Sequence, residues 1–267
     1  MSEIPLPRVS FAGRQIGRML LGGNPFSGFG HRPSVPGYDD HLREYFTDEK
    51  ILETMTVAYR AGINGFHLRG DENVFRWLAN FRAWAASQPD RPEPNWLAQS
   101  APDCYPDGKA EGNIEAMARH RPMAIYIHGG TSERLHDEGR IEELKGLVSF
   151  TKSLGFPAGI GSHRPEIIRL AHEREYGADF YILSLRSVDD EPNVCENEQT
   201  TAETFRAIPT QMVAIKALAA GRLPVAQAFR YAARTLKPAD LMTVGMRDYE
   251  VAENARLAAA AFKEVQA

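Results

Sequence analysis

Short apolar runs alternate with longer segments of helical period along most of the chain. The short runs have the length and composition of buried strands, and in the longer segments apolar residues recur every three or four positions. The predicted strands are 19–22, 65–68, 95–101, 124–128, 158–162, 180–183, 212–216 and 241–244. The predicted helices are 48–61, 73–87, 109–119, 140–154, 165–175, 200–208, 225–236 and 248–265.

This alternation predicts an α/β protein made of a single (β/α)8 TIM barrel over residues 1–267, because each predicted strand is followed by one helix. The chain length agrees with the roughly 250 residues that are typical of that fold. An open, doubly wound sheet is the alternative. Such a sheet usually carries a Gly-rich turn after its first strand, and no such turn follows residues 19–22.

One connection of the predicted barrel, residues 24–46, is longer than an ordinary link between a strand and a helix. Its sequence, NPFSGFGHRPSVPGYDDHLREYF, is rich in glycine, proline and aromatic residues. Loops of this length often lie over a functional site. We therefore expect this segment to cover the active-site face.

A lysine at a strand end is the strongest candidate for catalysis. The string MVAIKALAAGRL, residues 212–223, places Lys216 after an apolar run, and active sites of barrels form at the carboxyl ends of the strands. A partly buried ammonium needs a partner or a lowered pKa. Lys216 could act as a base, as a Schiff-base nucleophile or as a clamp for an anion, and a structural ion pair is the alternative.

Two histidines also follow predicted strands and are candidate proton donors or acceptors. His128 lies in AIYIHGG and His163 lies in GIGSHRP. A hydrogen-bonded core histidine is the alternative for His128. Asp71 completes the predicted catalytic set, although it precedes a predicted helix and could simply cap it.

Further polar residues fall at the same predicted rim and are candidates for substrate binding. They are Asn24, His67, Arg69, Gln99 and Ser162. Arg69 could instead serve only as the partner of Asp71. Three histidines and an aspartate could also form a mixed zinc or manganese site, but the chain has no HxH or HExxH spacing, so we assign no metal ligands.

A phosphate-binding loop is predicted near the end of the chain. In barrels, the last two strand-to-helix loops and a helix amino terminus often bind phosphate. The string VGMRDYEVAEN supplies Gly245, Arg247 and a helix start, and Arg222 lies on the neighbouring loop. Asp248 and Glu250 near that helix start could instead only cap it.

Composition limits the partners of the chain to small molecules. The net charge is −4 and no basic run occurs, so we expect neither nucleic acid nor an anionic membrane surface as a partner. The first ten residues lack the pattern of a signal peptide, and no apolar stretch has the length of a membrane span. Cys104 and Cys195 are far apart, which suits free thiols in the cytoplasm. The sequence gives no oligomeric state.

Several segments, in order, resemble the aldo/keto reductase family over nearly the whole chain. GRQIGRMLLGGNPFSG is similar to its first hairpin and strand, and ILETMTVAYRAGINGF to its first helix and the start of strand two. IYIHGG resembles the strand with the catalytic histidine, and GIGSHRPEII the segment after strand five. VAIKALAAGRL and TVGMRDYEVAENARLAAAAF resemble the motifs of strands seven and eight. The resemblance implies that Arg247 with Asn254 occupies the phosphate region of NADPH.

The family's catalytic residues are mostly replaced in this chain. His67 stands in place of the aspartate, Gln99 in place of the lysine, and no tyrosine follows in HLRGDENVF. Only His128 carries over. Ile215 replaces the aromatic residue that stacks on nicotinamide, and His163 replaces the asparagine that holds the carboxamide. Ketone reduction in that family uses the phenol as proton donor, so the family mechanism is not expected here.

Three functions follow from these observations. The first is a non-redox enzyme, an isomerase, epimerase or lyase that acts on a small hydroxylated carbonyl compound such as a sugar or sugar acid. The second is an NADPH-dependent reductase whose proton donor has moved to His67 or His128. The third is a binding protein that has lost catalysis. The cofactor stays open, with NADPH or a divalent metal as candidates.

Overall fold

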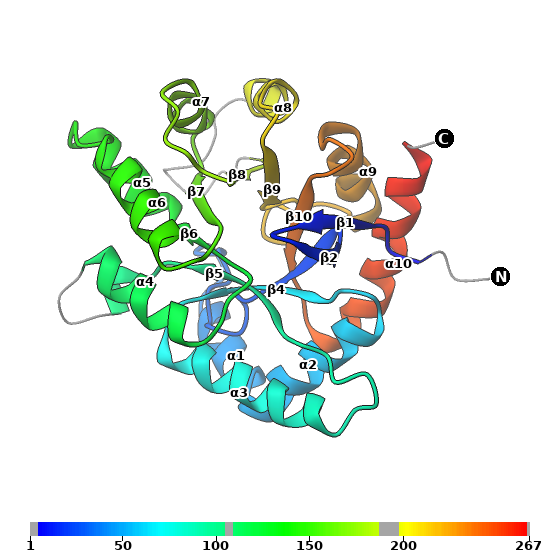
Figure 1. Cartoon of the computed structure of the whole chain (residues 1–267). Coiled ribbons are helices and arrows are strands. Elements are labelled where there is room, and N and C mark those ends of the chain that lie inside the picture. Colours follow the sequence, from blue (N-terminus) through cyan, green and yellow to red (C-terminus); the bar gives the residue numbers. More distant parts are fainter. Residues whose placement is uncertain (1–4, 105–108, 187–197, 266–267) are drawn as a thin grey trace.

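A computed structural model describes residues 5–104, 109–186 and 198–265. Parallel strands close into an eight-stranded barrel in which β10 returns to pair with β3, as the sequence predicts. Figure 1 shows the strands at the centre and the helices around them. The barrel strands are β3 (Met19–Gly22), β4 (Gly65–Arg69), β5 (Asn95–Gln99), β6 (Ala124–Ile127), β7 (Ala158–Ser162), β8 (Phe180–Ser184), β9 (Gln211–Ile215) and β10 (Leu241–Gly245). The ends of each predicted strand lie within two residues of the ends of an observed strand.

Every predicted helix is also present. These helices are α2 (Asp48–Arg60), α3 (Glu72–Ala86), α4 (Ala110–Arg119), α6 (Glu143–Ser153), α7 (Pro165–Glu173), α8 (Glu198–Ala207), α9 (Val225–Thr235) and α10 (Asp248–Glu264). The hydrophobic period did not predict α1 (Tyr38–Tyr45), α5 (Gly129–Asp137) or the short 3₁₀ turn η1 (Pro102–Cys104). Helix α5 begins with two glycines, which are poor helix formers, and follows β6 without a linker.

Apolar side chains form two separate layers because successive residues of a strand point to opposite faces. Residues that face the barrel axis, among them Leu97, Phe180 and Val213, pack with one another inside the barrel. The alternate residues pack against the surrounding helices. Near the carboxyl ends of the strands, polar side chains replace apolar ones at the cavity, where Tyr126, Gln99 and Thr243 lie. The site is therefore built on rigid strand ends.

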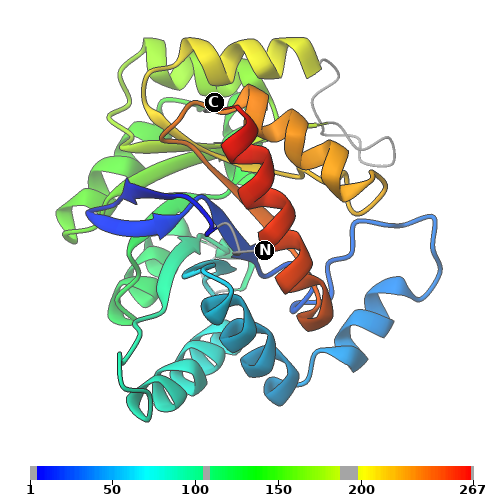
Figure 2. The same cartoon turned by 90° about the vertical axis from the view of Figure 1, so that its right-hand side faces the viewer.

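A hairpin and the long segment 24–46 lie at opposite ends of the barrel (Figure 2). The hairpin pairs β1 (Arg8–Phe11) with β2 (Arg14–Gly17), and Phe11 contacts the ring of Phe180 with 5.0 Å between centroids. Strand periodicity did not predict this hairpin, but the family resemblance implied it. The hairpin covers the amino-terminal end of the barrel and leaves the carboxyl end for the site.

Buried charges join the last two strands to the amino-terminal end of the barrel. The Arg18 side chain is 2% exposed and donates to the carbonyl oxygens of Asp240 and Lys237, 3.0 and 2.8 Å away. The Asp240 carboxylate is fully buried, and it accepts hydrogen bonds from the backbone nitrogen of Met212 and from the Lys237 ammonium. These contacts tie β9 and β10 to the start of β3.

We predict that Asp240→Ala lowers the free energy of unfolding by roughly 3–5 kcal/mol, because it leaves the Lys237 ammonium without its counter-charge and the buried backbone N–H of Met212 without its acceptor. Urea unfolding followed by circular dichroism measures this change. Asp40→Ala is the control, since Asp40 pairs with Arg43 at the surface and the loss is expected to be about 1 kcal/mol or less. Equal losses in the two variants would contradict the structural role of Asp240.

Candidate functional site

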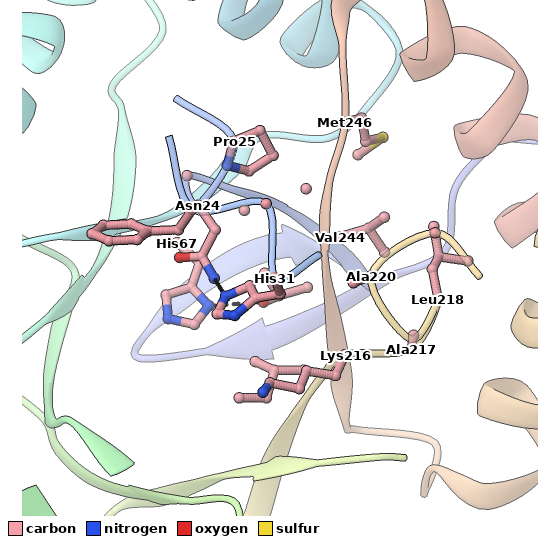
Figure 3. A pocket seen from close by; sticks show the side chains of 18 of the residues that line it. Asn24, Pro25, His31, His67, Lys216, Ala217, Leu218, Ala220, Val244 and Met246 are labelled. Carbon is pink, nitrogen blue, oxygen red and sulfur yellow. Dashed lines mark hydrogen bonds between the residues drawn. The ribbon is translucent and has the colours of Figure 1, made fainter. Parts of the chain in front are cut away.

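A cavity of about 600 Å³ opens at the carboxyl ends of the barrel strands. Figure 3 shows part of its lining, with residues from strands far apart in the sequence. The structure brings most of the predicted site residues to this cavity, namely Asn24, His67, Arg69, Gln99, His128, Ser162, His163, Lys216, Gly245, Arg247 and Asn254. Lys216 and His128 therefore share one cavity, as the sequence analysis expects.

Asp71 does not line the cavity. Its carboxylate accepts a hydrogen bond from the backbone nitrogen of Val74, 3.0 Å away, and so caps helix α3. The same carboxylate accepts a hydrogen bond from Arg69 at 3.2 Å. Asp71 thus caps a helix and pairs with Arg69 outside the cavity, which is the alternative to a role as catalytic acid or base.

Arg222 does not line the cavity either. Its guanidinium donates to the carbonyl oxygens of His31 and Ala219, at 3.2 and 3.1 Å. The His31 ring forms a 2.9 Å hydrogen bond with the amide nitrogen of Asn24 (Figure 3). Arg222 thus holds the segment 24–46 to the loop after β9. The sequence predicts that Arg222 binds a phosphate, but its guanidinium donates to backbone carbonyl oxygens instead.

The segment 24–46 forms part of the cavity wall through Pro25, Phe29, Gly30 and Tyr38. It is not a structureless loop, because residues 38–45 form helix α1. Its position agrees with the expectation that it lies at the active-site face.

A buried glutamate beside the cavity was not predicted. Glu133 lies on α5 and is 6% exposed. One of its carboxylate oxygens accepts three hydrogen bonds, from the Ser162 hydroxyl at 2.9 Å, the His163 backbone nitrogen at 2.6 Å and His163 Nδ1 at 3.0 Å. Gly129 allows this arrangement, because a Cβ there would lie 3.2 Å from the Ser162 backbone and 3.3 Å from the His163 ring.

The contact with Glu133 determines which nitrogen of His163 faces the cavity. Burial acts to raise the pKa of Glu133, but the hydrogen bonds and charge of His163 outweigh burial, so this pKa lies below its usual value. The ionised carboxylate accepts the proton on Nδ1. Because Nδ1 is engaged by Glu133, Nε2 is the ring nitrogen that His163 has left for the cavity that it lines.

His128 lies next to this pair at the start of α5. Its backbone nitrogen donates to the Ser100 hydroxyl, which accepts at 2.9 Å and fixes the end of β6. Burial, with smaller contributions from the charges of His163 and Arg69, lowers the pKa of His128 to about 4. The ring is therefore neutral at physiological pH, and it can donate or accept a proton.

A chain of buried hydrogen bonds crosses the floor of the cavity. The Thr243 hydroxyl lies 3.0 Å from His67 Nδ1, and His67 Nε2 lies 2.7 Å from the Tyr126 hydroxyl. Tyr126 in turn donates to the side-chain oxygen of Gln99 at 2.6 Å. Gly161 leaves room for the tyrosine ring, since a Cβ there would lie 2.8 Å from it. Tyr126 was not predicted, although its position two residues before His128 places both residues on the same face of the predicted strand 124–128.

His67 and Tyr126, the two titratable side chains of this hydrogen-bonded chain, are both neutral. Burial, aided by the charge of His128, lowers the pKa of His67 to about 3. Burial raises the pKa of Tyr126 well above its usual value, although the charge of Arg69 opposes this effect. The chain therefore keeps its protons over the physiological pH range.

Lys216 has an unusual backbone for a lysine. It is the first residue after β9, one position beyond the end of the observed strand, and its φ is +59°. Ala219 and Ala220 in the same loop also have positive φ values. Non-glycine residues in this region cost about 1–3 kcal/mol each and are concentrated at functional sites. The strained turn presents the Lys216 side chain to the cavity (Figure 3).

The predicted phosphate region lines the cavity but already carries carboxylates. Gly245, Arg247 and Asn254 are part of the wall. The backbone N–H of Arg247, at the start of α10, donates to Glu250 at 2.7 Å, and Asp248 accepts a hydrogen bond from Tyr45. This helix terminus therefore has acidic caps of its own, as the alternative interpretation allowed.

Within residues 5–104, 109–186 and 198–265, no three His, Cys, Asp or Glu side chains gather in a way that could hold a metal ion. Cys104 has a free thiol, and Cys195 lies outside the described residues. None of the helices in the described part of the chain is both long enough and apolar enough to cross a membrane.

Comparison with solved structures gives the fold a name. A protein from Pseudomonas aeruginosa described as an aldo-keto reductase is similar with a TM-score of 0.62 and 17% identity, over 97% of this chain and 96% of that one. A glycerol dehydrogenase from Gluconobacter oxydans is similar with a TM-score of 0.53 and 13% identity, over 100% and 95%. This chain has an aldo-keto reductase-like fold.

The aldo-keto reductase-like barrel also resembles other enzymes. An N-acetylmannosamine-6-phosphate 2-epimerase from Clostridium perfringens is similar with a TM-score of 0.53 and 12% identity, over 78% of this chain and 84% of that one. No protein-family model and no curated protein matches the sequence. These similarities show the fold of the chain and do not show which reaction it catalyses.

The cavity of this aldo-keto reductase-like barrel does not fit a nicotinamide dinucleotide well. Ile215 lines the cavity where the resemblance places an aromatic residue, so the nicotinamide ring would lack its stacking partner. At the start of α10 the cofactor's phosphates would meet the carboxylate of Glu250, which lines the cavity. These residues argue against the NADPH site that the resemblance implies.

We predict that the protein loses stability as the pH falls from about 6.5 toward about 4. In the unfolded chain, His67 and His128 bind protons near pH 6.5, whereas their folded pKa values are about 3 and about 4. The unfolded state therefore binds more protons in this window. The free energy of unfolding falls by up to about 1.4 kcal/mol per pH unit for each histidine.

Urea unfolding at about pH 7 and about pH 5 measures this effect. Replacing His128 by Asn should reduce the slope by about half, because His67 remains and still contributes its share. A free energy of unfolding that is the same at both pH values would contradict the neutral, buried state of the two histidines.

Proposed function

We propose that the cavity binds a small hydroxylated carbonyl compound, such as a sugar or sugar acid, and catalyses a non-redox acid/base reaction on it. The reaction is an isomerisation, epimerisation or elimination that begins with removal of a proton next to the carbonyl group. The observation that carries this proposal is the buried hydrogen bond between Glu133 and His163, since a carboxylate that holds an imidazole is a common arrangement for a general base.

His163 is the base in this proposal. Its Nε2 takes the proton from carbon, the electron pair of the C–H bond forms a carbon–carbon double bond, and the carbonyl π electrons move to oxygen. Glu133 stabilises the imidazolium that results. Its carboxylate is already ionised and held by Ser162, so little rearrangement is needed during the reaction.

His128 and Lys216 support the same reaction from the cavity wall. The imidazolium formed on His163 gives up its proton, and the neutral His128 ring can relay it by accepting at one nitrogen while it donates from the other to the neighbouring carbon or oxygen, so that both rings end neutral and the isomerisation needs no redox partner. The Lys216 ammonium can stabilise negative charge on the intermediate. Asn24, Arg69 and Ser162 line the cavity and can orient hydroxyl or carboxylate groups.

A reductase is the second candidate, because the similar structures include a glycerol dehydrogenase and because Arg247 and Asn254 line the cavity. The same fold also carries an epimerase, so the fold does not decide between the two. Titration of the protein with NADPH, followed by cofactor fluorescence, separates them. Tight binding together with NADPH oxidation by a carbonyl compound would favour the reductase.

Hydrogen exchange at carbon tests the proposed reaction without knowledge of the product. The protein is incubated in D2O with a panel of small sugars and sugar acids, and mass spectrometry follows deuterium next to the carbonyl group. We expect at least one compound to gain deuterium. His163→Asn and Glu133→Gln should each slow this exchange by roughly 100-fold, because they remove the base or the group that orients it.

Glu138→Gln is the matched control, since Glu138 is exposed and pairs with Arg134 and Arg140 at the surface. Its exchange rate should equal that of the wild type. An unchanged rate in Glu133→Gln would show that the buried glutamate does not serve the base. Absence of exchange with every compound of the panel would contradict the proposed function.

A further inference from the structure

The hydrogen-bonded chain on the cavity floor joins four strands and ends at Gln99. Thr243 comes from β10, His67 from β4, Tyr126 from β6 and Gln99 from β5. His67 is 7% exposed and Tyr126 is 2% exposed, so water cannot easily replace any of these contacts. The donor and acceptor roles along the chain must therefore be consistent with one another.

These roles determine a single direction. Tyr126 has one hydroxyl hydrogen, and it donates this hydrogen to the Gln99 side-chain oxygen, which can only accept. The tyrosine oxygen then accepts from His67 Nε2. A neutral imidazole carries one hydrogen, so His67 Nδ1 accepts from the Thr243 hydroxyl.

Because the hydrogen bonds run in this direction, the amide nitrogen of Gln99 can donate a hydrogen bond to a ligand. Gln99 lines the cavity, and its oxygen is already engaged by Tyr126. Within the described part of the chain, no residue accepts a hydrogen bond from the Gln99 amide nitrogen. Arg69 of β4 lies opposite Gln99 of β5 in the sheet register, and its guanidinium donates to Asp71 and Asp103.

We propose that the side-chain N–H group of Gln99 binds the carbonyl oxygen of the substrate, and that Thr243, His67 and Tyr126 are positioning residues that hold the amide in this orientation. This inference rests on the proposed function and adds the group that receives the oxygen. Negative charge grows on that oxygen as the proton leaves carbon, so a fixed donor stabilises the transition state more than the bound substrate.

The proposal also restricts the substrate. The group next to Gln99 has to be an acceptor, as in an aldehyde, a ketone or a carboxylate. Because the floor of the cavity is uncharged, it matches a carbonyl oxygen that gains negative charge only during the reaction. The hydroxyl oxygen of an alcohol can also accept from Gln99, but it gains no negative charge as a proton leaves carbon, so an alcohol of the same size lacks the stabilisation that this donor offers a carbonyl oxygen and is expected to bind there more weakly.

Nuclear magnetic resonance of ¹⁵N-labelled protein tests the direction of the chain in the absence of any ligand. Long-range correlations between ring hydrogens and nitrogens report which nitrogen of His67 is protonated. We expect the hydrogen on Nε2 and a bare Nδ1. A hydrogen on Nδ1 would overturn the proposal, because the chain would then run the other way and Gln99 would present its oxygen to the cavity.

The Gln99→Glu variant tests the role of the amide in the reaction. Glutamate keeps the oxygen that accepts from Tyr126 and removes the N–H group. The His67 protonation should therefore stay the same, while deuterium exchange falls by roughly 100-fold. Gln88→Glu, just after the end of α3 and outside the cavity lining, is the matched control and should exchange at the wild-type rate. A Gln99→Glu rate within about twofold of the wild type would overturn the proposal.

The same spectra separate this inference from the proposed function. Each carbonyl compound of the panel and its corresponding alcohol are added to wild-type protein, and the Gln99 side-chain NH₂ resonances are followed. If these resonances shift with a carbonyl compound but no deuterium is exchanged, the proposed function fails and the role of Gln99 stands. Resonances that stay unchanged with every carbonyl compound overturn the role of Gln99.

Discussion

A polar side chain that points into a closed barrel has to find its hydrogen-bond partner inside the barrel, because water is excluded there and an unpaired group costs free energy. This constraint organises the whole site. His67 and Tyr126 satisfy each other between Thr243 and Gln99, and the buried Glu133 is satisfied by Ser162 and His163. Because each group has few possible partners, both imidazole rings are held in one orientation. The apolar core below them gives these contacts a rigid base.

One wall of the cavity and its floor have complementary roles in the proposed reaction. In the proposed reaction, the wall built by α5 and the end of β7 supplies the base, and the floor built by β4, β5, β6 and β10 supplies a neutral donor. The site lacks the residues with which the aldo/keto reductases that it resembles reduce ketones, and its tyrosine comes from a different strand. A barrel of this fold can change its chemistry in this way because strand ends are rigid and their side chains can be exchanged independently.

The sequence predicts the barrel well, since strand and helix periods are local properties and both recur along the chain. It also predicts most of the polar rim, because the carboxyl ends of parallel strands must meet. It misses Glu133, which lies on a helix that starts with two glycines and reads as a polar loop. Tyr126 was hidden within an apolar strand, where an aromatic residue usually means packing. Asp71 and Arg222 were placed in the site because spacing reveals a strand end but not whether a side chain turns toward the cavity or toward the backbone nearby.

Neutron diffraction from a deuterium-exchanged crystal tests the central claim most directly, because it locates the hydrogens that the two hydrogen-bonded groups depend on. The account predicts deuterium on Nδ1 of His163, directed at an ionised Glu133, and deuterium on Nε2 of His67, directed at Tyr126. Deuterium on the Glu133 carboxyl group together with a bare Nδ1 on His163 would contradict it, since the imidazole would then have no lone pair to offer to the cavity.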